Sequence, residues 1–320
     1  SAFLARLANR FNNPPSSCRP MLQWSWNERL AKDRIDEVIR QCRERGMGGF
    51  FAHIRPGLTI PYLGDGWFDF WEYAARRCAE AGLEWHIYDE YTVGGGAAGG
   101  HTIARFPLAV QRELAVVAVV SEDQAADAME YYIFDASSTE TTQIDREAVG
   151  STLEQGERVL AVVHRIAPGG TRRNGLGPVD LYHPDTAREF IATTHERYAE
   201  RCGDLFGSTI KFCFNDEPHT TESRSSYPFS NRIAREFWSE HDYAIESKLE
   251  SLLFWKADSK EVRYDFYRTL NRLYCQGYVK PLHDWCAEHG LAFTGHFLEH
   301  RWPRPIGQPN AMAALRWMQA

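Results

Sequence analysis

Apolar side chains follow a repeating pattern along the first part of the chain. Residues 28–45 place them at the i, i+3, i+4 and i+7 positions of an amphipathic helix, and Gly46 follows as a candidate helix end. Residues 47–53 then form a short apolar run that is typical of a buried strand. The apolar positions of this first helix are Ile35, Val38, Ile39 and Cys42. The pattern predicts one unit of helix, glycine and strand.

The same unit recurs about every 35 residues, which is typical of βα units with parallel strands. A second helix carries Trp67, Trp71 and Cys78 on one side and ends at Gly82. Thr186 and Glu189 have the spacing of a capping box, so we expect a helix to start there. The strands predicted in this way cover residues 47–53, 83–90, 209–217 and 291–299, and the apolar run at residues 21–26 supplies the expected first strand.

Five such strands are fewer than the eight that close a parallel barrel. The chain is therefore either an open α/β sheet or a piece of a longer barrel protein, since its last residues, 311–318, still have a helix-like pattern. We favour the second alternative. The predicted fold is α/β, a (β/α)8 barrel of the TIM type that is incomplete in this chain.

One segment interrupts the βα pattern. Three β-rich runs separated by Ser, Thr, Glu and Asp lie in it, at residues 115–120, 131–134 and 158–163. We expect a small antiparallel insertion on a barrel loop. The predicted organisation is barrel strands 1 to 3 in residues 1–113, the insertion in 114–168, and the fourth and fifth strands with a following helix in 169–320.

The composition is that of an ordinary globular chain, with 320 residues, 43% of them hydrophobic and 25% charged. No apolar run approaches the ~18 residues of a spanning helix, so we expect no membrane partner. The formal charge of −7 comes from interspersed acids and bases, so we expect no nucleic acid either. Aromatic residues make up 13% and include 10 Trp, which suits core packing as well as stacking on sugars or bases.

The seven cysteines show no CxxC pair, so the sequence contains no zinc-knuckle or redox motif. Their irregular spacing favours free thiols in a reducing compartment. The apolar run at the N-terminus is too short for the core of a signal peptide. We therefore expect a cytoplasmic location.

Polar and charged side chains gather where the predicted strands end. In parallel barrels the carboxyl ends of the strands face the active site. Glu217 also precedes Pro218, and a proline favours extended geometry at the residue before it. The strand-end residues are Asn27, His53, Arg55, Asp89, Glu90, Asp216, Glu217, His296 and Glu299. The sequence therefore predicts one site of carboxylates, imidazoles and a guanidinium.

Several segments resemble one group of enzymes. Residues 13–27 and 48–63 are similar to the opening of the glycoside-hydrolase-like barrels that include the family 106 α-L-rhamnosidases. The segments Tyr88-Asp-Glu90, Asn215-Asp-Glu-Pro218 and Thr294-Gly-His296 follow in the order expected for that group. The chain departs from the group at Thr92-Val-Gly-Gly-Gly96, where relatives tend to have Trp-Pro-Ser-Gly, and it is shorter than typical members.

The resemblance implies cleavage of an O-glycosidic bond in a plant- or microbe-derived glycan or glycoside. One carboxyl group protonates the leaving oxygen, and another activates water or attacks the anomeric carbon. By motif position Glu217 would be the acid and Glu299 its partner. No cofactor is implied, although some relatives look calcium-assisted, so a structural or catalytic Ca²⁺ would be compatible with this chemistry. The residues expected to bind the carbohydrate are Trp26, Asn27, His53, Arg55, Asp89, Glu90, Asp216 and His296.

Two other functions use the same residues. A metal-dependent hydrolase or lyase could take His53, Asp89, Glu217 and His296 as ligands, although the chain has no HxH or HExxH pair. A catalytically inactive carbohydrate-binding barrel is the second alternative. Core packing remains an alternative for Trp26, and a structural role for His86. The glycines of residues 94–100 lack GxGxxG spacing, so we interpret them as a rim loop and not as a phosphate-binding loop.

Overall fold

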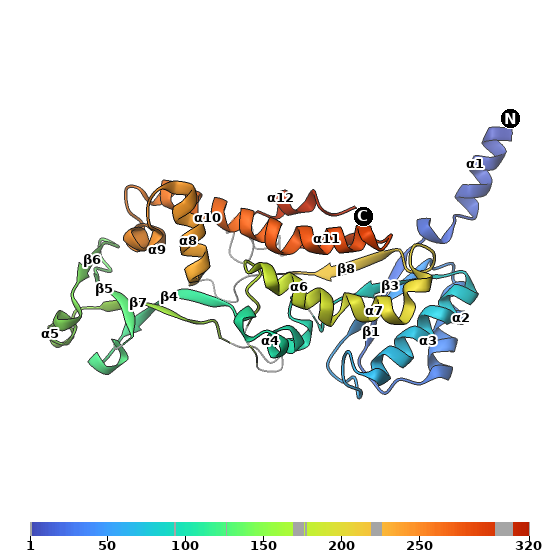
Figure 1. Ribbon diagram of the computed structural model, residues 1–320, viewed down its shortest axis with the longest axis horizontal. Helices are drawn as coiled ribbons and strands as arrows, with labels where there is room; N and C mark the ends of the chain where they lie inside the picture. Colours follow the sequence, from blue (N-terminus) through green and yellow to red (C-terminus); the bar gives the residue numbers. More distant parts are fainter. Residues whose placement is uncertain are drawn as a thin grey trace.

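The computed structural model describes residues 2–92, 94–125, 127–168, 176, 178–218, 226–297 and 310–319. Within these residues the chain forms two five-stranded sheets with helices packed on them. Figure 1 shows an elongated molecule, with the parallel strands towards one end, the antiparallel strands at the other, and helix α1 (Ala2–Asn12) projecting from the parallel end. No described helix is long and apolar enough to cross a membrane.

The first sheet is parallel throughout and has the strand order β1-β2-β3-β8-β10. Each strand corresponds to one of the five predicted from the sequence, four of them from the helix–glycine–strand pattern, so that prediction is confirmed. The strands are β1 (Met21–Trp26), β2 (Gly49–Ile54), β3 (Glu84–Tyr88), β8 (Phe212–Asp216) and β10 (Ala292–His296). The fold is therefore mixed α/β with one parallel sheet. The described residues form no closed eight-stranded barrel, and the (β/α)8 architecture stays a prediction.

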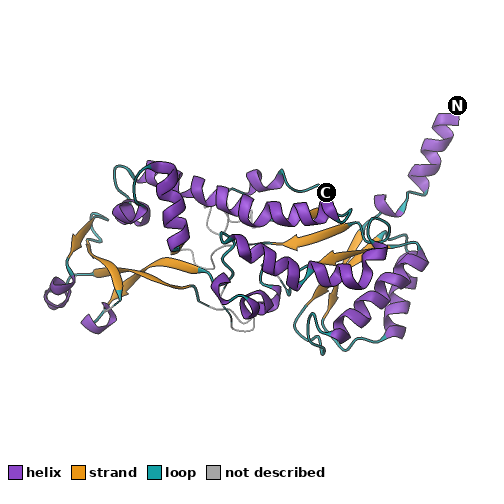
Figure 2. Ribbon diagram, in the orientation of Figure 1, coloured by secondary structure: helices purple, strands orange, loops and turns teal. Residues whose placement is uncertain are grey.

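Helices connect the parallel strands and lie along them (Figure 2). The predicted apolar stripes are buried, for example Ile35 and Ile39 on α2 and Trp67 and Trp71 on α3. Gly82 ends α3 in the left-handed conformation, as a glycine at this position should. The connecting helices are α2 (Lys32–Glu44), α3 (Asp65–Ala81), α4 (His101–Arg105), α6 (Pro184–Thr193), α7 (His195–Cys202) and α11 (Lys280–Glu288).

The start of α6 differs from the prediction. Helix α6 begins at Pro184, and the backbone N–H of Asp185 donates to Nδ1 of His183 at 3.2 Å. The capping box predicted at Thr186 is therefore wrong, because that residue already lies inside the first turn. A proline at the first helical position was the better start signal, since its missing N–H has no partner in a helix anyway.

The second sheet is antiparallel, with the order β6-β5-β7-β4-β9. Three of its strands match the β-rich runs predicted between residues 114 and 166, while β6 and β9 were not predicted. The strands are β4 (Arg112–Val119), β5 (Ala128–Phe134), β6 (Thr141–Ile144), β7 (Val159–Ile166) and β9 (Ser226–Pro228). Strand β9 joins from far along the chain, so this sheet is not built from a single continuous insertion.

The remaining helices are α5 (Val149–Glu154), α8 (Asn231–His241), α9 (Leu249–Leu253), α10 (Ser259–Tyr274) and α12 (Ala311–Leu315), and a π-helical turn, Cys275–Val279, joins α10 to α11.

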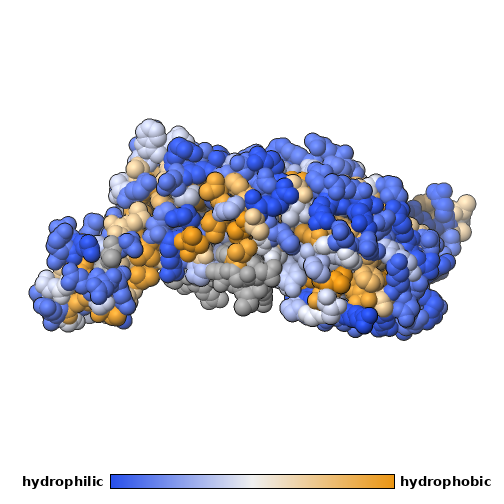
Figure 3. All heavy atoms as spheres, turned by 60° about the horizontal axis from the view of Figure 1, so that its bottom comes forward, coloured by the Kyte–Doolittle hydropathy of each residue, from blue (hydrophilic) through white to orange (hydrophobic). Residues whose placement is uncertain are grey.

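The surface in Figure 3 carries apolar areas between larger hydrophilic ones. Large apolar side chains that are exposed include Phe3, Leu4, Leu7 and Phe11 on α1. Some large hydrophobic side chains of the described residues therefore lie on the surface and not in the core.

Tryptophans form the core between the parallel sheet and its helices. Trp26 is only 1% exposed, and its ring centroid lies 5.2 Å from that of Trp67 and 5.8 Å from that of Trp85. Trp71 packs on the other side of Trp85 at 5.8 Å. Burying such large rings gives each of them a large share of the hydrophobic stabilisation. Much of the aromatic content of the chain therefore serves the core.

Gly295 lets strand β10 lie against β8. Its φ is +143°, and a Cβ atom added there would lie 2.0 Å from the backbone oxygen of Asn215. We therefore expect Gly295→Ala to lower the free energy of unfolding by about 2 kcal/mol or more, because strain and overpacking add. Equilibrium unfolding in urea measures the change. Gly156→Ala is the matched control for positive φ, since nothing lies within 4 Å of its added Cβ. An equal loss in both variants would mean that the contact with β8 contributes nothing.

Candidate functional site

The alternation of side chains along β3 and β8 divides the polar residues between two faces of the sheet. Tyr88 and Asp216 lie on the face that also carries the stacked rings of Phe51 and Phe214. Asp89, one residue after Tyr88, lies on the opposite face, against the helices. Because successive side chains along a strand point to opposite faces, the adjacent residues Tyr88 and Asp89 lie in different environments.

Three side chains meet at the carboxyl ends of β8 and β10. Asp216 and His296 are register partners on these strands, and Nε2 of His296 lies 2.9 Å from Oδ1 of Asp216. On its other side, Nδ1 of His296 lies 3.9 Å from Oε1 of Glu217. The backbone N–H of Glu217 donates to the carbonyl of His296 at 2.9 Å, which continues the ladder beyond the strand. An imidazole thus stands between a buried and a partly exposed carboxyl group.

Asp216 is held in its ionised form. Its carboxylate is almost fully buried, and burial alone would raise its pKa. The contacts with His296 and with the Tyr88 hydroxyl, which donates to Oδ2 at 2.5 Å, outweigh burial and leave the pKa of Asp216 below its ordinary value. Burial, followed by the charge of Asp216, raises the pKa of Tyr88, so Tyr88 stays a hydrogen-bond donor. Asp216 is therefore an anion and not a proton donor near neutral pH.

Glu217 has a strained backbone. Its φ is +42°, in the left-handed region that a side chain with a Cβ rarely adopts. The extended geometry predicted from Pro218 is wrong here, because backbone bonds to neighbouring segments hold the turn. The N–H groups of Gly94 and Gly95 donate to the carbonyl of Asp216 at 3.0 and 2.8 Å, and Glu217 itself is bonded to β10. Strain of this kind is stored mostly where function requires a side chain at one position.

His53 and Trp26, both expected to contact a carbohydrate, are buried instead. The Nε2 atom of His53 contacts the carbonyl of Thr92, and its Nδ1 atom contacts the side-chain amide of Gln23. Burial lowers the pKa of His53, so its ring is neutral. Trp26 belongs to the tryptophan core. The structure gives both residues structural partners, and we do not propose them as carbohydrate ligands.

Glu90 holds the glycine-rich loop that follows β3. Its side chain is 1% exposed, and its carboxylate accepts four backbone N–H groups, those of Tyr91, Ala97, Ala98 and Gly99, at 2.7 to 2.9 Å. The loop, residues 94–100, is buried throughout. Glu90 is thus a structural anchor beneath the rim and not a group that could touch a ligand, contrary to the expectation from its place at a strand end.

The other predicted residues lie apart from the Asp216–Glu217–His296 cluster. Asn27 is exposed after β1, and Arg55, half-buried after β2, forms no ion pair with a described carboxylate. Asp89 is fully buried. Glu299 lies outside the described residues. Of the eight strand-end residues that the structure describes, Asp216, Glu217 and His296 form the cluster. His53 lies beside it, with its ring centroid 4.3 Å from that of Tyr88.

Some residues that contact Asp216 or Asp89 were not among the predicted site residues. Tyr88, which binds Asp216, and His195 and Cys213, which contact Asp89, are examples. The histidine opens a helix and the cysteine lies mid-strand, so their spacing from Asp89 follows no short motif. Alternation along β3 was the one available signal for Tyr88, because it predicts that Tyr88 and Asp89 point to opposite faces.

Comparison with known proteins gives a likeness of fold. No family model and no curated protein matches the chain. Among solved structures, one shares the fold with a TM-score of 0.64 over 98% of this chain, at 14% sequence identity. The likeness is to a rhamnosidase, from Novosphingobium sp. PP1Y. The chain spans 49% of that neighbour's length. The comparison supports the mixed α/β fold, and the assignment to family 106 stays a prediction.

Proposed function

We propose that the chain carries the acid–base site of a glycoside hydrolase that cleaves an O-glycosidic bond. The observation that carries the proposal is the meeting of Asp216, Glu217 and His296 at the carboxyl ends of adjacent parallel strands. This edge of a parallel sheet is where α/β enzymes place their reactive groups. The fold likeness to a rhamnosidase supports a carbohydrate substrate, and an α-L-rhamnoside is the first to test.

In this proposal Glu217 protonates the leaving oxygen. It is the partly exposed carboxyl group of the cluster, and its backbone is held at β8 and β10. Asp216 is buried and anionic, so it orients His296 and favours the developing positive charge of an oxocarbenium-like transition state. Glu299 is the proposed second carboxylate. Its separation from Glu217 would distinguish inversion from retention of the anomeric centre.

A metal-assisted reaction is the second candidate function. Ligand atoms of Asp216, Glu217 and His296 all lie within 4.8 Å of one another, a spacing that suits a divalent ion. Two carboxylates and one imidazole favour a hard or borderline cation, and Ca²⁺ is the ion proposed from the resemblance. His53 and Asp89, the other ligands considered for a metal enzyme, have partners elsewhere.

Turnover of aryl glycosides tests both candidates. The purified chain is incubated with a panel of nitrophenyl glycosides that includes the α-L-rhamnoside, with and without a chelator. We expect saturable release of nitrophenol from at least one sugar, unaffected by chelation if the carboxylates act alone. Loss of turnover on chelation and its return with Ca²⁺ would favour the metal-assisted reaction. No release from any glycoside would contradict the proposed function.

A further inference from the structure

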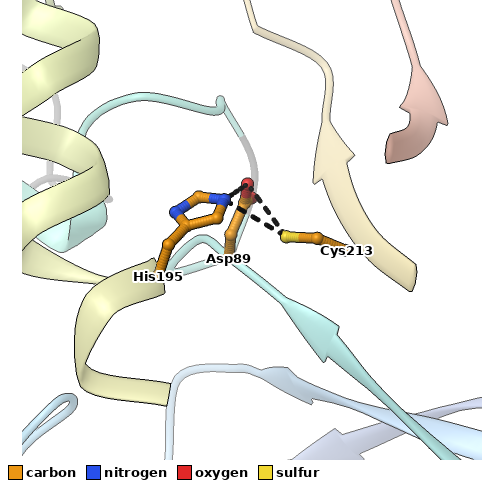
Figure 4. A group of neighbouring side chains, drawn as sticks. All are labelled: Asp89, His195 and Cys213. Atoms are coloured by element: carbon orange, nitrogen blue, oxygen red, sulfur yellow. Dashed lines mark hydrogen bonds and ion pairs between the residues drawn. The ribbon is translucent and has the colours of Figure 1, made fainter. Parts of the chain in front are cut away.

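A second cluster of metal-binding side chains lies on the other face of the sheet, away from the proposed catalytic rim. Asp89 after β3, His195 at the start of α7 and Cys213 on β8 converge there (Figure 4). All three side chains are fully buried, with relative exposures of 0%. They come from three elements that are far apart in the sequence, so only the folded chain assembles them.

The distances between the three donor atoms are those of a tetrahedral metal site. Sγ of Cys213 lies 3.3 Å from Nε2 of His195 and 3.7 Å from Oδ2 of Asp89, and the nitrogen and oxygen are 3.4 Å apart. The points equally distant from all three atoms lie on the axis through the centre of this triangle, about 2.0 Å from each atom in its plane and farther away above it. An ion above the plane therefore reaches bond lengths of about 2.1 to 2.3 Å, which are those of Zn²⁺ with N, O and S ligands. A direct hydrogen bond between an imidazole and a carboxyl group would be shorter, about 2.8 Å.

The surrounding hydrogen bonds turn lone pairs towards that point. The Thr194 hydroxyl donates its hydrogen to the carbonyl of Phe190 at 2.7 Å, so its oxygen accepts from Nδ1 of His195, also at 2.7 Å. His195 therefore carries its proton on Nδ1 and points the lone pair of Nε2 at Asp89 and Cys213. A metal-bound histidine is usually fixed in this way by a partner on its other nitrogen.

Asp89 is oriented in the same manner. The side-chain NH₂ of Asn215 donates to both of its oxygens at 3.0 Å, and it also donates to the hydroxyl oxygen of Tyr278 at 3.1 Å. The carboxyl group is thus fixed by an amide that itself has no ligand role. Carboxylates that bind a metal ion are typically hydrogen-bonded in this way by a neighbouring group that orients them.

We propose that Asp89, His195 and Cys213 bind one zinc ion that stabilises the fold beneath the sheet, independently of the proposed glycosidase activity. One thiolate, one imidazole and one carboxylate suit Zn²⁺ better than Ca²⁺ or Mg²⁺, which prefer oxygen ligands.

Binding displaces two protons. Burial, followed by the charge of Glu90, raises the pKa of Asp89, and burial raises the pKa of the Cys213 thiol, so the ion must compete with protons for both groups. Burial lowers the pKa of His195 to about 3, so its ring is already neutral. Zn²⁺ replaces the carboxyl and thiol protons, which pass to solvent, and forms bonds to Oδ2, Sγ and Nε2. Affinity should therefore fall as the pH is lowered.

Metal analysis of the purified full chain tests this site. We expect one zinc per chain in the wild type and in Cys78→Ser, a control that alters another fully buried thiol on α3. In Cys213→Ser and in Asp89→Asn we expect less than a tenth of that content. Asp89→Asn decides the question if Cys213→Ser does not fold, because the amide keeps the shape of the protonated acid and is a poor zinc ligand.

Cobalt substitution gives a readout that needs no variant. Co²⁺ added to zinc-free chain should produce the thiolate-to-cobalt charge-transfer absorption of a tetrahedral sulfur site, and should raise the melting temperature. Two results would overturn the proposal. One is a wild-type chain that takes up neither metal when each is supplied during folding. The other is a folded Asp89→Asn chain that retains its zinc.

Discussion

Glu217→Gln should lower kcat/KM on nitrophenyl glycosides by about 10²- to 10⁴-fold, the usual contribution of a positioned general acid. The amide keeps the volume of the side chain and cannot give a proton to the leaving oxygen. Steady-state kinetics on whichever glycoside the wild type hydrolyses measures the loss. The variant should keep its fold, because Glu217 is partly exposed and its anchoring bonds come from the backbone.

Leaving-group dependence separates an acid from other roles. A dinitrophenyl leaving group departs without protonation, so the same variant should lose much less activity on a dinitrophenyl glycoside. Glu154→Gln, an exposed glutamate at the end of α5, controls for the loss of one charge and should behave as wild type. Equal losses on both leaving groups would assign Glu217 a binding or charge-stabilising role, and an unchanged rate would remove it from the site.

Most strands of the parallel sheet could be predicted because they are short apolar runs that follow a helix pattern and a glycine. Glycines such as Gly82 marked the helix ends, and the buried positions of α2 and α3 are those of the 3.6-residue pattern. Strand β9 could not be predicted, since three residues carry no periodicity and its partners on β4 are more than 100 residues away. Whether the strands close into a barrel also depends on pairing between residues that are far apart in the sequence, and a local hydrophobic pattern carries no information on such pairing.

The candidate site was predicted in part, because strand-end position says which edge a residue occupies and not which face. Asp216 points to the face that carries Tyr88, whereas Asp89 points to the helices, and one step along a strand makes the difference. Glu90 looked like a rim residue, yet its partners are backbone N–H groups of the following loop. Only long-range packing decides such partners, as it does for His195 and Cys213.

Glu90→Gln should lower the free energy of unfolding by about 3–5 kcal/mol. Each carboxylate oxygen of Glu90 accepts two buried backbone N–H groups, Oε1 from Tyr91 and Gly99, and Oε2 from Ala97 and Ala98. A glutamine must place an NH₂ group against one of these pairs, which leaves two buried donors without an acceptor, at about 1–3 kcal/mol each. Urea unfolding measures the loss, with Glu154→Gln as the exposed control. A loss as small as the control's would mean that the loop of residues 94–100 keeps its conformation without the hydrogen bonds to the Glu90 carboxylate. In that case the strain at Ala98, which has a φ of +49°, would be balanced by packing alone.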